Sequence, residues 1–250
     1  GLVGPVWAVV ALTLPVGLES IVSWAFARPF LKNQPAAPEA PPRLRDLLGF
    51  TLPLTGGGYF LSLATVVLAG IMARAPDPER MIPVYYLALG LASPVAFGAT
   101  RMQTIVLAFP PADRFQGQTL RFAVAAGCIL GLLPLVFILP GLDRFYYVQL
   151  QNLDPADLQW VRQTAAVLTL LPLAVALRAQ SEGLATWLKK PSIVLLGHGV
   201  FLITAAAAGA AALGLGLTGC LIGAASLPLG SLASSATMRL AMRKSAVTGA

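Results

Sequence analysis

The sequence predicts an all-α integral membrane protein with seven transmembrane helices. Of its 250 residues, 57% are hydrophobic and only 11% are charged, whereas about a quarter of the residues of a soluble domain carry a charge. Seven apolar stretches reach the ~20 residues that a helix needs to cross a bilayer. They are continuously apolar and do not alternate as barrel strands do. This composition excludes most soluble enzymes, DNA-binding domains and disordered proteins.

The predicted helices follow one another closely, apart from one long linker. They lie at 2–27, 47–73, 82–109, 119–140, 157–188, 192–213 and 216–242. The linker, 28–46, holds five prolines, a composition typical of semi-rigid spacers. We therefore expect 1–27 to be the last helix of a truncated N-terminal bundle and 28–46 to be a cytoplasmic linker. Residues 47–244 would form a C-terminal six-helix bundle, and 245–250 a cytoplasmic tail.

The basic residues predict the orientation of the chain. Eleven of the 17 Lys and Arg residues lie at or beside alternate connections between the predicted helices, and three lie at the connections between those. The eleven are Arg28, Lys32, Arg43, Arg45, Arg114, Arg121, Lys189, Lys190, Arg239, Arg243 and Lys244. Because positive loops stay in the cytoplasm, we expect a multi-pass protein of a bacterial inner membrane with its C-terminus inside. The net charge of +7 then needs no nucleic-acid partner.

The first and last predicted helices share a pattern. Residues 1–4 and 14–17 read GLVG and LPVG, and residues 216–219 and 227–230 read GLTG and LPLG. We interpret this as a repeat unit of six helices, with the first helix belonging to a preceding unit of the same chain. Secondary transporters are often built from such repeats. The alternative is chance similarity between helices rich in Gly, Leu and Pro.

Five ionisable residues lie deep inside the predicted spans, away from their ends: Glu19, Arg101, Arg178, Glu182 and His198. Charges are costly in a bilayer, so each is a candidate functional residue. The guanidinium of Arg178 can donate two parallel hydrogen bonds to a carboxylate or phosphate. Glu182 lies four residues later on the same helix face, where it would hold the Arg178 side chain or compete with the anion for it. The alternatives are a neutral packing pair for these two, and snorkelling of Arg101 to the headgroups. Glu19 and His198 are candidate ion-coupling residues, and packing is the alternative for the histidine.

Proline and glycine mark candidate hinges within the spans. Pro53 and Gly56, Gly57 and Gly58 lie in the second predicted helix, and Pro172 lies in the fifth. Such residues mark kinks or breaks at transporter substrate sites, although close helix packing is an equal alternative for the glycines. No G-x-S-x-G motif or metal-ligand spacing occurs, so we expect neither an enzyme nor a cofactor or metal site.

Several stretches resemble the multidrug/oligosaccharidyl-lipid/polysaccharide exporter superfamily, and most of all its progressive ankylosis protein family. The likeness covers about 47–244. It is carried by Pro53-Leu54, by 94–110 with Pro94, Arg101 and Phe109-Pro110, by 172–190 with Pro172, Val175, Arg178-Ala179, Gly183 and Leu188-Lys189-Lys190, and by the Gly-rich 215–223. The resemblance implies two parallel six-helix bundles that rock about a central site.

The resemblance also implies a substrate class, which is multivalent anions such as pyrophosphate, nucleotide or citrate. Arg178 and Arg101 would contact the anion, together with Glu182. Glu182 departs from the family, where a neutral residue is expected. This departure keeps a cation-coupled multidrug or lipid-linked glycan exporter of the same superfamily as an alternative. A second alternative is a membrane scaffold that transports nothing and whose charges are fully paired.

Overall fold

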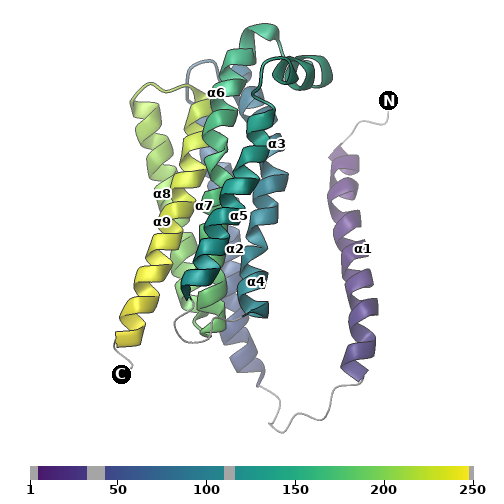
Figure 1. The fold of residues 1–250 in the computed structure, drawn as a ribbon, viewed down its shortest axis with the longest axis vertical. Helices are drawn as coiled ribbons and strands as arrows, with labels where there is room; N and C mark the ends of the chain where they lie inside the picture. Colours follow the sequence, from purple (N-terminus) through teal and green to yellow (C-terminus); the bar gives the residue numbers. More distant parts are fainter. Residues whose placement is uncertain (1–4, 33–42, 110–115, 248–250) are drawn as a thin grey trace. The chain divides into compact units, whose positions relative to one another are not determined.

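The computed structural model describes residues 5–32, 43–109 and 116–247. These residues form helices and connections, and no strand occurs among them. The chain divides into two compact units, Gly1–Asp46 and Leu47–Ala250, and each is described by itself. Figure 1 shows the helices in chain order.

The first unit contains helix α1, Pro5–Lys32. This helix covers most of the first predicted span and continues five residues into the predicted linker, past Pro29. Most of the predicted linker, 33–42, lies outside the described residues. The apolar side chains that the structure describes in α1 are exposed, as expected of a helix that needs lipid or a partner to cover it.

The second unit is a bundle of α-helices with two short irregular helices. The α-helices are α2 (Leu44–Met72), α3 (Pro78–Thr100), α4 (Met102–Ala108), α5 (Gln116–Val136), α6 (Leu158–Leu168), α7 (Leu170–Trp187), α8 (Pro191–Gly214) and α9 (Gly219–Val247). A π-helix, Arg144–Leu150, and a single 3₁₀ turn, Pro155–Asp157, lie between α5 and α6. Successive spans run antiparallel (Figure 1).

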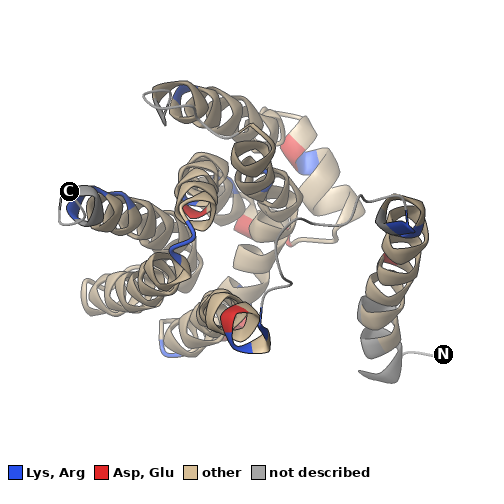
Figure 2. Cartoon of the chain, turned by 90° about the horizontal axis from the view of Figure 1, so that it is seen from below, with Lys and Arg blue, Asp and Glu red and all other residues tan. Residues whose placement is uncertain are grey.

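Six helical spans in the described part of the chain are long and apolar enough to cross a membrane. They are Leu44–Met72, Pro78–Ala108, Gly117–Val136, Pro155–Trp187, Pro191–Gly214 and Gly219–Lys244. They correspond to the second to seventh predicted helices and indicate a multi-pass membrane protein. That the first predicted helix, α1, also crosses the membrane stays a prediction. Viewed along the bundle, the ribbon carries few charged positions (Figure 2).

Helix α7 is the central helix of the bundle. Its residues from Leu171 to Ala185 are nearly all buried, and it packs against α3, α4, α5, α8 and α9. Glycines bring the neighbouring helices close, as small residues do in membrane bundles. A Cβ at Gly127 of α5 would lie 2.7 Å from the Cα of Leu173, and a Cβ at Gly183 of α7 would lie 3.0 Å from the Gln103 carbonyl oxygen of α4.

The span Pro155–Trp187 is interrupted at Thr169, between α6 and α7. Pro172 explains the break, because a proline has no N–H to offer the carbonyl of the residue four positions earlier and its ring clashes with that carbonyl. That residue is Leu168, the last residue of α6. Pro172 thus lies three residues after this interruption, at which Thr169 keeps helical dihedrals (φ −61°, ψ −22°).

Candidate functional site: a buried arginine, glutamate and histidine

Three predicted site residues meet inside the bundle. Arg178 and Glu182 lie one turn apart on α7, and the Arg178 Nη1 is 3.3 Å from the Glu182 Oε1. His198 of α8 reaches the same oxygen, with its Nε2 at 2.7 Å. All three residues are at least nine-tenths buried. We call Arg178, Glu182 and His198 the buried triad.

The hairpin between α7 and α8 sets the register of the triad. Lys189 adopts a left-handed backbone conformation with φ 55°, and Pro191 begins α8, a position where its missing N–H costs nothing. Glu182 lies five residues before the end of α7, and His198 lies seven residues after the start of α8. At 1.5 Å per residue, both are within about 11 Å of the hairpin end.

Glycines make room for the histidine. The position that a Cβ would take on Gly57 of α2 is occupied by the His198 ring, with Nδ1 as the nearest atom. The preceding residue of α8, Gly197, packs closely against Met238 of α9. A Cβ on Gly197 would be 2.5 Å from the Met238 Cγ. These contacts fix the His198 imidazole between α2 and α7.

The triad has more hydrogen-bonding capacity than it uses. The Nε and Nη1 of Arg178 and the Nδ1 of His198 are buried without a hydrogen-bond partner. The Arg178 guanidinium also lies 5.4 Å from the centre of the Phe201 ring, a cation–π contact that leaves the N–H groups unbonded. Buried donors without partners are costly, so the Arg178 side chain is ready for a further acceptor.

A second polar network lies on the adjacent faces of α7. The Arg239 Nη2 donates to the Gln180 Oε1 at 2.6 Å, and its Nε donates to the Ser181 Oγ at 3.0 Å. Gln180 also donates to Thr119 of α5, and Ser181 lies 2.9 Å from Ser235. Sequence reasoning missed this network, because it used Arg239 only as a marker of the chain's orientation.

The other predicted contacts and coupling residues lie elsewhere. Arg101 is exposed at the junction of α3 and α4, and its guanidinium is 5.3 Å from the centre of the Phe97 ring. This arrangement fits the snorkelling alternative. Glu19 is exposed at the middle of α1, in the first unit. The structure therefore brings together Arg178, Glu182 and His198.

The predicted hinge residues of α2 lie within an unbroken helix, which runs from Leu44 to Met72. Pro53 and the three glycines do not interrupt it. A Cβ on Gly56 would be 3.5 Å from Leu195, and a Cβ on Gly58 would meet nothing within 4 Å. Close packing thus accounts for Gly57, by its contact with His198.

The opposite end of the bundle carries two ion pairs that sequence reasoning missed. Arg80 pairs with Asp157, and Arg162 pairs with Asp143. Burial alone would raise the pKa of Asp143, but hydrogen bonds from the Arg144 and Gly141 backbone N–H groups and from Arg162 lower the pKa below its ordinary value. The available signal was that both aspartates lie at the ends of apolar spans.

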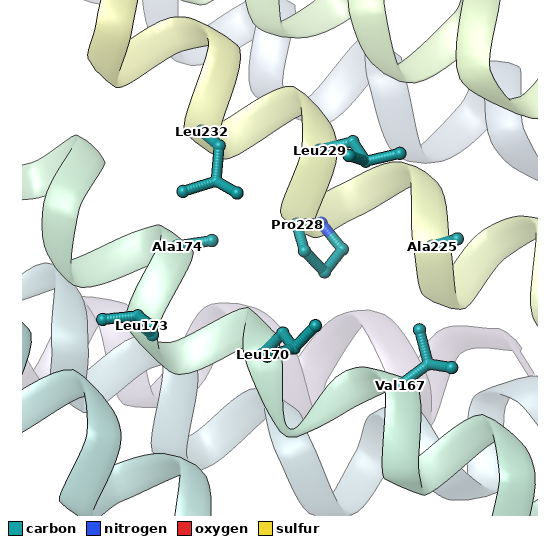
Figure 3. A pocket seen from close by; sticks show the side chains of 8 residues that line it. All are labelled: Val167, Leu170, Leu173, Ala174, Ala225, Pro228, Leu229 and Leu232. Carbon is teal, nitrogen blue, oxygen red and sulfur yellow. The ribbon is translucent and has the colours of Figure 1, made fainter.

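An apolar cavity of about 270 Å³ lies apart from the triad, between α6, α7 and α9 (Figure 3). Its lining side chains are Val167, Leu170, Leu173, Ala174, Ala225, Pro228, Leu229 and Leu232. The cavity lies beside Thr169, where Val167 and Leu170 line it, and Pro228 of α9 lines it from the other side. Its lining suits only an apolar group.

Comparisons with protein-family models, with curated proteins and with solved structures gave no match. Within the described ranges, no group of three or more His, Cys, Asp or Glu side chains could hold a metal ion. The functional argument therefore rests on the buried triad.

Proposed function

We propose that this chain contains the C-terminal six-helix bundle of a secondary transporter that exports organic or phosphorylated anions, such as pyrophosphate, nucleotide or citrate. The protein would belong to the multidrug/oligosaccharidyl-lipid/polysaccharide exporter superfamily. It would lie in a bacterial inner membrane with its C-terminus in the cytoplasm. The second wall of the site would come from a preceding bundle of the same chain, as the repeat in the sequence predicts.

The observation that carries this proposal is the unused hydrogen-bonding capacity of Arg178. Its Nε and Nη1 are buried without hydrogen-bond partners, although Glu182 is close enough to balance the charge. A structural arginine would normally have its donors satisfied. A planar guanidinium with free donors is a binding group for carboxylate or phosphate.

Transport requires the triad to become accessible, because Arg178 is only 8% exposed. Rocking of one bundle against another alternately exposes a midplane site to the two sides of a membrane. Arg178 lies nine residues before the end of α7, a depth of about 14 Å. That is near the middle of a hydrocarbon core of about 30 Å.

Two other functions have some support. The buried Glu182 is a carboxylate that could attract a cationic drug, as in a cation-coupled exporter. The ion pair between Arg178 and Glu182 would also suit a membrane scaffold that transports nothing. The absence of hydrogen-bond partners for the Arg178 Nε and Nη1 favours the anion exporter over both.

The test is an efflux assay with the purified protein in proteoliposomes, offering citrate, pyrophosphate, nucleotide and a cationic dye in competition. We expect anion efflux that falls at least tenfold in Arg178→Gln. The control is Arg121→Gln, which removes an exposed arginine of α5 and should leave efflux unchanged. Efflux of the dye alone would favour the cation exporter. Equal anion efflux in wild type and Arg178→Gln would contradict the proposal.

A further inference from the structure

On the basis of the proposed anion transport, we propose that each anion bound at Arg178 is taken up together with one proton, which His198 accepts at its Nδ1. The anion and the proton would then cross the membrane in the same direction. The inference deepens the proposed function by naming its coupling ion and the atom that carries it.

The first step concerns the tautomer of His198. Its Nε2 lies 2.7 Å from a Glu182 oxygen, and an ionised carboxylate can only accept hydrogen bonds. The Nε2 therefore carries the hydrogen, and in a neutral imidazole the Nδ1 is then an unprotonated base. That Nδ1 is buried without a hydrogen-bond partner and lies against Gly57 of α2, in the place that a Cβ would take.

The second step is the charge balance of the triad. With His198 neutral, the positive Arg178 balances the negative Glu182. An anionic group that binds Arg178 adds a negative charge to a buried site, where an unbalanced charge is expensive. A proton on the His198 Nδ1 offsets one such negative charge. The imidazolium then pairs with Glu182 and the guanidinium pairs with the anion, so two cations face two anions.

The third step is the surroundings of the triad, because other charges could supply the balance instead. In the contacts described, α2 brings Gly57 to His198, and α4 brings Gln103 and Val106 to Gly183, all uncharged. From α8, Phe201 lies beside Arg178. From α9, Arg239 brings a further charge to α7, where its side chain binds Gln180 and Ser181.

Arg239 does not replace the proton. Its guanidinium bonds to the neutral side chains on the adjacent faces of α7, and its charge is the same before and after an anion binds. His198 is the remaining group of the triad that can gain a positive charge. Reciprocity of linked binding then requires that protons raise anion affinity just as the anion raises proton affinity.

The test is calorimetric titration of the purified protein with citrate between pH 7 and 8, in two buffers of different ionisation enthalpy. Citrate is fully ionised at the upper end of this range. The protons released by citrate alone are measured in a blank without protein and are subtracted. We expect about one proton taken up per citrate bound, with affinity falling up to tenfold per pH unit as pH rises. The matched variant is His198→Gln, whose amide can still donate to Glu182 but cannot take up a proton.

The outcomes separate this inference from the proposed function. Proton uptake in wild type that disappears in His198→Gln while citrate still binds would support the inference. Citrate binding without proton uptake in wild type would overturn it and leave anion transport standing. A failure of wild type to bind citrate, pyrophosphate or nucleotide would overturn both. The wild-type proton count needs no variant, so the test holds even if His198→Gln fails to fold.

Discussion

At the scale of the residue, Glu182 joins the buried triad, because its carboxylate contacts both of the other members. One of its oxygens, Oε1, lies within 3.3 Å of the Arg178 Nη1 and 2.7 Å of the His198 Nε2. Burying an ion pair gains little over burying apolar groups, whereas removing one partner leaves a charge without compensation. The triad is therefore expensive for stability alone, and this cost supports a functional role.

This argument predicts an asymmetry between single and double substitutions. Glu182→Leu leaves the Arg178 guanidinium as an uncompensated buried charge, so we expect a loss of about 3–5 kcal/mol in the free energy of unfolding. The double variant Arg178→Met with Glu182→Leu removes both charges and should recover most of this loss. Thermal unfolding in detergent micelles measures both. A double variant no more stable than Glu182→Leu alone would show that the pair is not coupled.

Only part of the triad could be predicted from the sequence. Arg178 and Glu182 share a helix face by their spacing alone, so their proximity was expected. The approach of His198 depends on the turn at Lys189 and on the missing Cβ of Gly57, and neither can be read as a distance from sequence. Arg101 is a predicted contact that lies apart from the triad. Hydropathy places this residue in a span but does not give the direction of its side chain.

At the scale of the element, helix α5 supports the break between α6 and α7. A Cβ on Gly131 would lie 2.5 Å from the Thr169 carbonyl oxygen, which belongs to the residue at the break. Pro172 removes a hydrogen bond from this turn, and Gly131 lets α5 pack directly against it. The break could be predicted from Pro172, but its glycine partner on α5 could not, because no local signal links the two helices.

We therefore predict that Gly131→Ala is destabilising despite the higher helix propensity of alanine. The new methyl group would meet backbone, which cannot rotate away, so we expect a loss of about 1–3 kcal/mol. The matched control is Gly117→Ala in the same helix, where a Cβ meets nothing within 4 Å and the substitution should be neutral or slightly stabilising. Thermal midpoints of the two variants in the same detergent decide the matter, and equal midpoints would contradict the packing argument.

At the scale of the whole molecule, charged residues gather at both ends of the bundle. Near the α7–α8 hairpin, Lys189 is exposed beside Lys190, and α9 ends nearby with Arg243 and Lys244 (Figure 1). At the other end, Arg80 and Arg162 are tied to Asp157 and Asp143. The six long spans follow from composition alone, since apolar length decides them. The pairing of arginine with aspartate across the bundle does not, because it depends on contacts between distant segments.

The Asp143–Arg162 pair predicts how stability depends on pH. Folding lowers the pKa of Asp143 below its ordinary value of 3.8, so the unfolded chain binds its proton more readily than the folded protein does. The resulting stabilisation is complete above about pH 4 and is lost as pH falls through the folded pKa.

Asp143→Asn keeps an oxygen that can accept from the Gly141 and Arg144 N–H groups but loses the charge that faces Arg162. We expect about 1–3 kcal/mol less stability at pH 7, and a gap from wild type that closes as the pH falls below 4. Asp77→Asn is the control, because Asp77 is exposed at the same end with φ 51°, a conformation that asparagine also adopts. Thermal midpoints in detergent from pH 3 to 7 give the comparison. A gap that stayed constant across this range would show that the Asp143 charge contributes nothing to stability.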